Sequence, residues 1–110
     1  MKHQEFDEHQ MNSPIPVDPA QIIAFCRKWK VREFSIFGSV LRQDFGPQSD
    51  VDVLVSFEPD APWSYFEWAD MTDELKAIFG RDVDLVEKES LQNPYRRHAI
   101  LSSRQVLYAA

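Results

Sequence analysis

Three short apolar segments rich in β-branched and aromatic residues place the strongest limit on how this chain can fold. They are VREFSIF at residues 31–37, DVDVLVSF at 50–57 and DVDLV at 82–86. Each is short for a helix and carries the residue types that favour strands. Turn-forming residues, Gly38-Ser39 and Gly46-Pro47, separate the first segment from the second. The segments therefore predict a β-sheet at the centre of the fold.

The stretches between these segments have helical periodicity. Asp18-Pro19 is an N-cap followed by proline at the first helical position, and an apolar face follows at Ile22, Phe25, Cys26 and Trp29. A second helix is predicted from about residue 64 to 79, ended by Gly80, and a third from 94 to 103. Only a short helix fits after Gly38-Ser39. The chain ends in an apolar extended piece at 106–108.

This order predicts an α/β (α+β) fold, with a small mixed β-sheet flanked by helices. The length of 110 residues favours one domain, which we expect over residues 18–110. Residues 1–17 have no periodicity and indicate a flexible tail. A metal site between His3 and His9 in that tail is not favoured. The chain has no apolar signal segment and no membrane-length apolar run, so we expect a cytoplasmic protein without membrane association.

The net charge of −6 argues against nucleic acid as a partner. A nucleic-acid-binding protein usually shows a basic stripe, and the basic clusters Arg27-Lys28 and Arg96-Arg97 are more typical of solvated helix faces. We expect no direct nucleic-acid binding. The acidic balance suits a metal site or a basic protein partner. Cys26 is the only cysteine, which excludes an intrachain disulfide. Its place on the apolar face of the first predicted helix favours a small core residue.

Asp50 and Asp52 carry the strongest chemical signal. Two residues apart on a strand, their side chains project to the same side, roughly 6.5–7 Å apart. At an effective dielectric near 20 two such charges repel by about 2 kcal/mol. A divalent cation reverses this effect, and Mg²⁺ favours one or two carboxylates together with phosphate oxygens. On these two residues alone, capping of the preceding turn is an equally good interpretation.

A third acid, Asp84, lies inside an apolar segment. A carboxylate in a central strand needs a partner, because burying an unpaired charge costs several kcal/mol. If the third strand lies beside the second, Asp84 completes a cluster of three carboxylates able to hold two metal ions. Asp82 would share its face and is the rival candidate. Its position at the start of the strand also fits capping of the Gly80-Arg81 turn.

Gly38-Ser39 ends one strand and begins a short helix. Glycine allows the backbone to approach a ligand closely, and the N–H groups of a helix start favour anions such as phosphate. Ser39 would add a hydroxyl donor. Taken alone, the pair fits a plain turn with an N-cap better than it fits a phosphate site.

Together these parts resemble the signature of the DNA polymerase β-type nucleotidyltransferase superfamily. The pattern GSxxRxD followed by SDxDxLV is similar to its minimal, MNT-type branch. In this sequence it comprises Gly38, Ser39, Arg42, Asp44, Ser49, Asp50, Asp52, Leu54 and Val55. The later RDVDLVEKESL also resembles that branch, so the resemblance spans about residues 19–109. One departure is Val40, where many members carry a basic or aromatic residue.

The resemblance implies a nucleotidyltransferase fold and transfer of a nucleoside monophosphate that depends on Mg²⁺, with two ions. Asp50 and Asp52 would hold both metals, and Asp84 would hold the catalytic one. The residues implied to bind the nucleotide are Gly38, Ser39, Arg42 and Ser49. For Arg42 an exposed helical arginine is the alternative. The branch also implies an antitoxin that transfers AMP from ATP to a hydroxyl, a tyrosine, of a HEPN-domain ribonuclease toxin, in a hetero-oligomer with it.

Two functions from different classes follow. One is this enzyme, and the other is a non-catalytic antitoxin that neutralises the toxin by binding and masking it. The presence of all three aspartates favours the enzyme, because an inactive site would be free to lose carboxylates that repel each other. A small-molecule nucleotidyltransferase is less favoured, since such proteins normally add a domain. His98 is expected on the surface of the last helix rather than in a hydrolase site.

An aromatic group follows Pro62, at Trp63, Tyr65 and Phe66. Its spacing favours a place in the core. An exposed docking patch is the alternative.

Overall fold

The computed structural model describes residues 16–42, 46 and 48–110. Within these ranges one four-stranded sheet has the order β3-β2-β1-β4. Its strands are β1 Val31–Phe37, β2 Val51–Phe57, β3 Val83–Glu87 and β4 Gln105–Ala109. Strand β1 pairs antiparallel with β2 and β4, and β2 pairs parallel with β3. The sheet is therefore mixed, as the sequence predicts.

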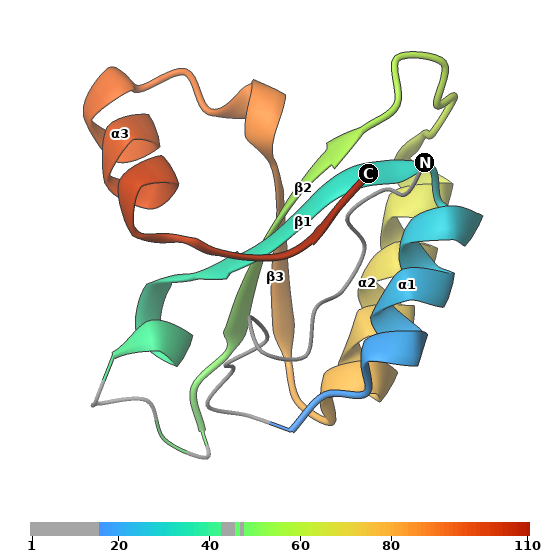
Figure 1. Cartoon of the computed structure of the whole chain (residues 1–110), viewed down its shortest axis with the longest axis horizontal. Coiled ribbons are helices and arrows are strands. Elements are labelled where there is room, and N and C mark those ends of the chain that lie inside the picture. Colours follow the sequence, from blue (N-terminus) through green and yellow to red (C-terminus); the bar gives the residue numbers. More distant parts are fainter. Residues whose placement is uncertain (1–15, 43–45, 47) are drawn as a thin grey trace.

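Helices lie on both faces of the sheet (Figure 1). They are α1 Pro19–Lys28, α2 Tyr65–Phe79 and α3 Pro94–Ser103, with the 3₁₀ turns η1 Gly38–Leu41 and η2 Lys88–Ser90. Local chemistry sets their ends. The Asp18 carboxylate accepts a hydrogen bond from the Ala20 N–H at 3.0 Å, and Gly80 ends α2 in the left-handed conformation at φ 72°. None of the helices in the described ranges has both the length and the apolar character that crossing a bilayer takes.

The alternation of β2 divides the core between the two faces. Val51, Val53 and Val55 belong to the main cluster, which includes the buried residues of α1 and α2, Cys26 among them. Leu54 points the other way, into a smaller cluster with Phe37, Leu91 and Ile100. Figure 1 shows α3 beside one end of the sheet and η1 beside the other, where β2 and β3 begin. The face that carries Asp52 therefore has α3 over only part of its length.

Most predicted elements are confirmed. The first strand and the last helix have the predicted bounds, while β2 and β3 each begin one residue later than expected. The short helix after Gly38-Ser39 is one 3₁₀ turn. The extended piece at 106–108 is part of β4, an edge strand paired with β1. Two groups of residues discussed above lie outside the described residues: 1–15, which include His3 and His9, and Asp44 of the motif. Val17, at the end of the predicted tail, packs against the main cluster.

The preference for a core position is wrong for Tyr65 and Phe66, which are 91% and 83% exposed. They occupy the first two positions of α2, and Phe66 precedes the buried Leu75 by nine residues, or two and a half helical turns. Phe66 therefore faces away from the core. Trp63 is half-buried, with its ring 5.2 Å from that of Trp29 and its Nε1–H donating to the Trp29 carbonyl at 2.7 Å.

Candidate active site

The parallel pairing of β2 and β3 brings two of the predicted acids together. Asp52 and Asp84 are Cα partners in this register. Paired residues on neighbouring strands point to the same face, and such strands lie about 4.8 Å apart. Asp50 lies directly ahead of β2, two residues before Asp52. Asp50 and Asp84 are exposed, while Asp52 is half-buried.

The surroundings of Asp52 raise the pKa of its carboxyl above the usual value of 3.8. Burial is the largest cause, followed by the negative charges of Asp84 and Asp50. A hydrogen bond from the Ser39 backbone N–H and the positive charge of Arg42 act in the opposite direction. Asp52 is thus the centre of an acidic group in which its own negative charge is disfavoured.

Gly38 lies against this carboxylate. Phe37 pairs with Asp52 across β1 and β2, and Gly38 follows with φ 75°. A Cβ added at Gly38 would lie 2.2 Å from Oδ2 of Asp52. The sequence predicted that glycine would allow close approach to a phosphate; in the structure it allows close approach to a carboxylate. The neighbouring Val40 is fully buried in the main cluster, so the departure from the family pattern there fills the core.

Ser49 helps to build the turn that leads into Asp50. Its Oγ accepts a hydrogen bond from the Gly46 N–H at 3.1 Å, and its own N–H donates to the Gly46 carbonyl at 3.0 Å. Arg81 Nη1 donates to the carbonyls of Gly46 and Ser49, at 3.0 and 3.1 Å. The turn is therefore fastened to the start of β3. Sequence reasoning did not identify Arg81, although it directly precedes the Asp82-Val-Asp84 motif.

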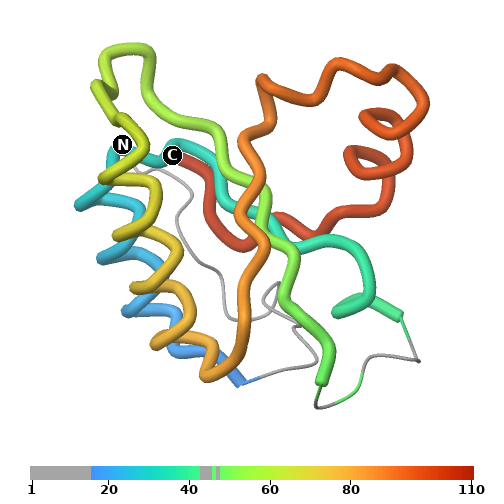
Figure 2. The backbone as a smooth tube through the Cα atoms, turned by 180° about the vertical axis from the view of Figure 1, so that it is seen from behind, coloured from blue at the N-terminus to red at the C-terminus, as the bar shows by residue number. Residues whose placement is uncertain are grey.

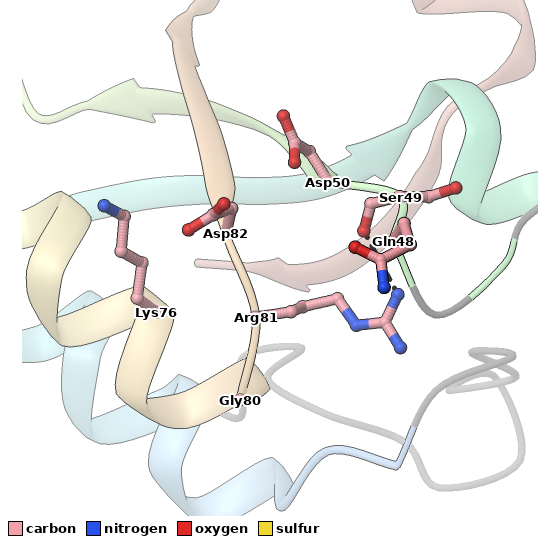
Figure 3. A pocket seen from close by; sticks show the side chains of 7 residues that line it. All are labelled: Gln48, Ser49, Asp50, Lys76, Gly80, Arg81 and Asp82. Carbon is pink, nitrogen blue, oxygen red and sulfur yellow. Dashed lines mark hydrogen bonds between the residues drawn. The ribbon is translucent and has the colours of Figure 1, made fainter.

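Next to this turn is a polar pocket of about 430 Å³ (Figure 3). It is lined by Gln48, Ser49, Asp50, Lys76, Gly80, Arg81 and Asp82. Figure 3 shows the Arg81 side chain reaching from the segment before β3 toward Gln48 and Ser49, with Asp82 extending to the other side of that segment. Asp82 is exposed, and its backbone carbonyl accepts from the Val51 N–H at 2.9 Å. Asp84, and not this rival, is among the charges that act on Asp52.

The chemistry of these residues fits a divalent cation. Carboxylate oxygens are the protein ligands that Mg²⁺ favours, completed by waters and substrate phosphates. A bound cation would stabilise the charged form of Asp52 most, because two neighbouring carboxylates disfavour its charge. No group of three His, Cys, Asp or Glu side chains within residues 16–42, 46 and 48–110 has the arrangement of a metal site. His98 is exposed on α3, as the sequence predicts.

Comparison with known proteins places this site in a family. Residues 21–107 match the nucleotidyltransferase domain. The chain is 37% identical over 81 residues to the protein adenylyltransferase MntA of Thermococcus cleftensis, a match covering 74% of this chain and 77% of that protein.

Two solved complexes share the fold at 22% identity. A toxin–antitoxin complex with AMP-PNP has a TM-score of 0.65 and covers 83% of this chain and 73% of that chain. A complex of tri-AMPylated Shewanella oneidensis HEPN toxin with MNT antitoxin has a TM-score of 0.59, covering 83% and 69%. The match to the family extends over most of the chain and includes Gly38, Ser39 and the three aspartates. The chain therefore belongs to the nucleotidyltransferase domain family.

Proposed function

We propose that this chain is a protein adenylyltransferase of the cytoplasm that acts as an antitoxin. It transfers AMP from ATP, with Mg²⁺, to a hydroxyl of a HEPN-domain toxin, a tyrosine in particular, within a hetero-oligomer of the two proteins. The observation that carries the proposal is the pairing of Asp52 with Asp84 beside Gly38 in a nucleotidyltransferase domain. The name of the relative MntA and the AMPylated toxin in a complex of the same fold support the acceptor.

The residues divide between metal and nucleotide. Asp50 and Asp52 would hold both ions, and Asp84 would hold the catalytic one. The nucleotide would be bound by Gly38, Ser39, Arg42 and Ser49. Mg²⁺, when bound, neutralises charge on the attacking and departing oxygens. The positive charge of Arg42, already close enough to act on Asp52, suits it to a triphosphate.

In the reaction, the acceptor oxygen forms a bond to the α-phosphorus of ATP, and the bond from that phosphorus to the bridging oxygen breaks. Pyrophosphate leaves, and AMP remains on the acceptor. The acceptor hydroxyl must lose its proton, and Asp84 is the carboxylate assigned to take it. Asp84 is exposed at the edge of the described sheet, so a side chain of another protein has access to it. The rest of the site positions the reactants.

The proposal is tested by incubating the chain with ATP, Mg²⁺ and the HEPN-domain protein, and measuring the intact mass of that protein. We expect a gain of one or more AMP units, abolished by Asp52→Asn and by Asp84→Asn. Asp73→Asn is the matched control, because Asp73 is an exposed carboxylate on α2 that neither lines the pocket beside Asp50 nor is among the charges that act on Asp52. Absence of transfer, with toxin neutralisation surviving Asp52→Asn, would favour the non-catalytic antitoxin that masks its partner.

A further inference from the structure

The start of α2 exposes two large aromatic side chains next to an apolar groove. Tyr65 and Phe66 are the aromatic pair, 91% and 83% exposed. The groove has a volume of about 730 Å³. Its lining includes Trp63, Tyr65, Trp68, Leu85, Val86 and Glu87, from the start of α2 and from β3; we name it the α2–β3 groove. Figure 2 shows α2 and β3 running in opposite directions, so the start of α2 lies toward the end of β3.

Folding does not account for the exposure of this pair. The neighbouring tryptophans already supply the packing, since Trp63 contacts Trp29 and the Trp68 ring lies 6.2 Å from that of Phe57. Tyr65 and Phe66 remain largely in solvent. Exposed aromatic side chains beside an apolar groove are typical of a protein-binding site, where rings contribute large contact areas at low entropic cost.

The groove and the acidic site share strand β3. Leu85 and Val86 line it, and they directly follow Asp84 on β3. At about 3.3 Å per residue, Val86 lies roughly 7 Å along the strand from Asp84. Strand β3 is also the outer strand of the described sheet on this side. Leu85 faces α2, whereas Val86 shares the face of Asp84. A polypeptide that leaves the groove over Val86 therefore reaches the face of the sheet that carries the Asp84 carboxylate.

The charge of this region selects the occupant. Glu87 is the only charged residue in the lining, and the chain as a whole carries −6. A second copy of the chain would bring the same negative charge to the contact, which disfavours self-association. Nucleic acid is disfavoured for the same reason. Apolar side chains flanked by Lys or Arg complement both the rings and the charge.

We infer that the α2–β3 groove docks the segment of the HEPN-domain partner that presents the acceptor hydroxyl, with Tyr65 in its lining and Phe66 next to it as the aromatic anchors. This inference rests on the proposed function, because it takes its partner from there. It adds a surface that recognises the acceptor protein, separate from the residues that bind the nucleotide. Aromatic anchors of this kind dominate affinity, so their removal lowers it at least tenfold.

The test compares the double variant Tyr65→Ala/Phe66→Ala with Tyr95→Ala. Tyr95 is a suitable control because it is an 85% exposed aromatic residue in the first turn of α3, outside the groove. Affinity for the HEPN-domain protein is measured by calorimetry without ATP. KM for that protein is measured in the AMP-transfer assay, and titration with AMP-PNP reports on the nucleotide site. We expect the double variant to lose affinity at least tenfold and to raise KM, with AMP-PNP affinity unchanged, while Tyr95→Ala matches the unmodified chain.

Unchanged affinity of the double variant for the HEPN-domain protein would overturn the docking role, and so would an equal loss in Tyr95→Ala. A homodimer that dissociates in the double variant would assign the groove to a second copy and overturn the inference as well. If the unmodified chain binds the partner through the groove but transfers no AMP, the docking role stands and the proposed activity fails. The two hypotheses are thus separately testable.

Discussion

Gly38 and Asp52 approach each other so closely that no side chain fits between them. A Cβ at Gly38 would lie 2.2 Å from Oδ2 of Asp52, well inside the limit of 3.0 Å that real Cβ atoms respect. The backbone of Gly38 also has φ 75°, a conformation that other residues rarely adopt. The absence of a side chain at Gly38 therefore leaves the space that the Asp52 carboxylate occupies.

Gly38→Ala should abolish most of the activity as well as reduce stability. The left-handed backbone alone costs about 1–2 kcal/mol for alanine, and relief of the clash must displace Asp52. Misplacement of a reacting geometry by about 1 Å costs on the order of 100-fold in rate. Initial rates of AMP transfer, with urea unfolding in parallel, measure both effects.

Gly80→Ala is the matched control. Gly80 has nearly the same backbone conformation, at φ 72°, but an added Cβ there meets nothing within 4 Å. It should lose similar stability and keep its transfer rate. Equal loss of activity in both variants would show that the contact with Asp52 is not what matters.

Asp52→Asn should stabilise the protein in the absence of Mg²⁺ while abolishing transfer. The raised pKa of Asp52 means that the folded state binds its proton more tightly than the unfolded state does. Stability therefore falls as pH rises from about the usual 3.8 through the raised pKa, and the deficit persists above it. Asparagine carries no charge to repel Asp84 and Asp50, so we expect the Tm at pH 8 to rise by a few degrees.

The same measurement tests the metal. Added Mg²⁺ should raise the Tm of the unmodified chain more than that of Asp52→Asn, because binding to the folded state stabilises it. Below pH 3.8 the difference between the two proteins should disappear as the carboxyl becomes protonated in both states. A lower Tm for Asp52→Asn at pH 8 without Mg²⁺ would contradict the electrostatic account.

Arg81→Ala should weaken nucleotide and metal binding although Arg81 is not one of the proposed ligands. Its guanidinium donates hydrogen bonds to the carbonyls of Gly46 and of Ser49, the residue directly before Asp50. Hydrogen bonds from a charged donor contribute about 1.5–3 kcal/mol each. We expect roughly tenfold increases in KM for ATP and in the Mg²⁺ concentration for half-maximal rate.

Two further substitutions separate positioning from simple loss of charge. Arg81→Lys should recover part of the loss, since lysine keeps the charge but lacks the planar fork of guanidinium. Arg96→Ala removes an exposed arginine from α3 and should have no effect. If Arg81→Ala changed stability but neither KM nor the Mg²⁺ requirement, the role of Arg81 would be structural only.

Local patterns explain why so much of the fold was predictable. Strong caps at Asp18, Gly80 and Asn93 mark helix ends, and the alternation along residues 31–37 and 51–57 marks strands. The pairing of β4 with β1 was not predictable from these patterns, because it joins residues some 70 positions apart. The three-residue apolar piece at its centre gives little periodicity to read.

The candidate site also has a part that was predictable from the sequence and a part that was not. The positions of Asp50, Asp52 and Asp84 follow from the period of two and from the family pattern, once β3 lies beside β2. Two contacts depend on how loops fold onto the sheet. One is the approach of Gly38 to Asp52, and the other is the pair of hydrogen bonds from Arg81 to the Gly46 and Ser49 carbonyls. Backbone carbonyls carry no residue-specific signal, so such contacts leave no trace in the sequence.

Two buried serines should respond in opposite ways to replacement by alanine. Ser35 and Ser56 are 0% and 2% exposed and lie on the α3 side of the sheet. The Ser56 hydroxyl donates to Oε2 of Glu89 at 2.5 Å, whereas Ser35 Oγ has no hydrogen-bond partner among the residues that the structure describes. A buried polar group without a partner is costly, and a satisfied one is stabilising.

Ser56→Ala should therefore reduce the free energy of unfolding by about 1 kcal/mol, and Ser35→Ala should leave it unchanged or raise it by up to about 1 kcal/mol. Urea unfolding at constant m-value measures both, since a shift in midpoint alone reports stability. Because the substitutions are chemically identical and both sites are buried, the difference isolates the hydrogen bond. A loss in Ser35→Ala as large as that in Ser56→Ala would mean that the Ser35 hydroxyl has a stabilising partner in solution.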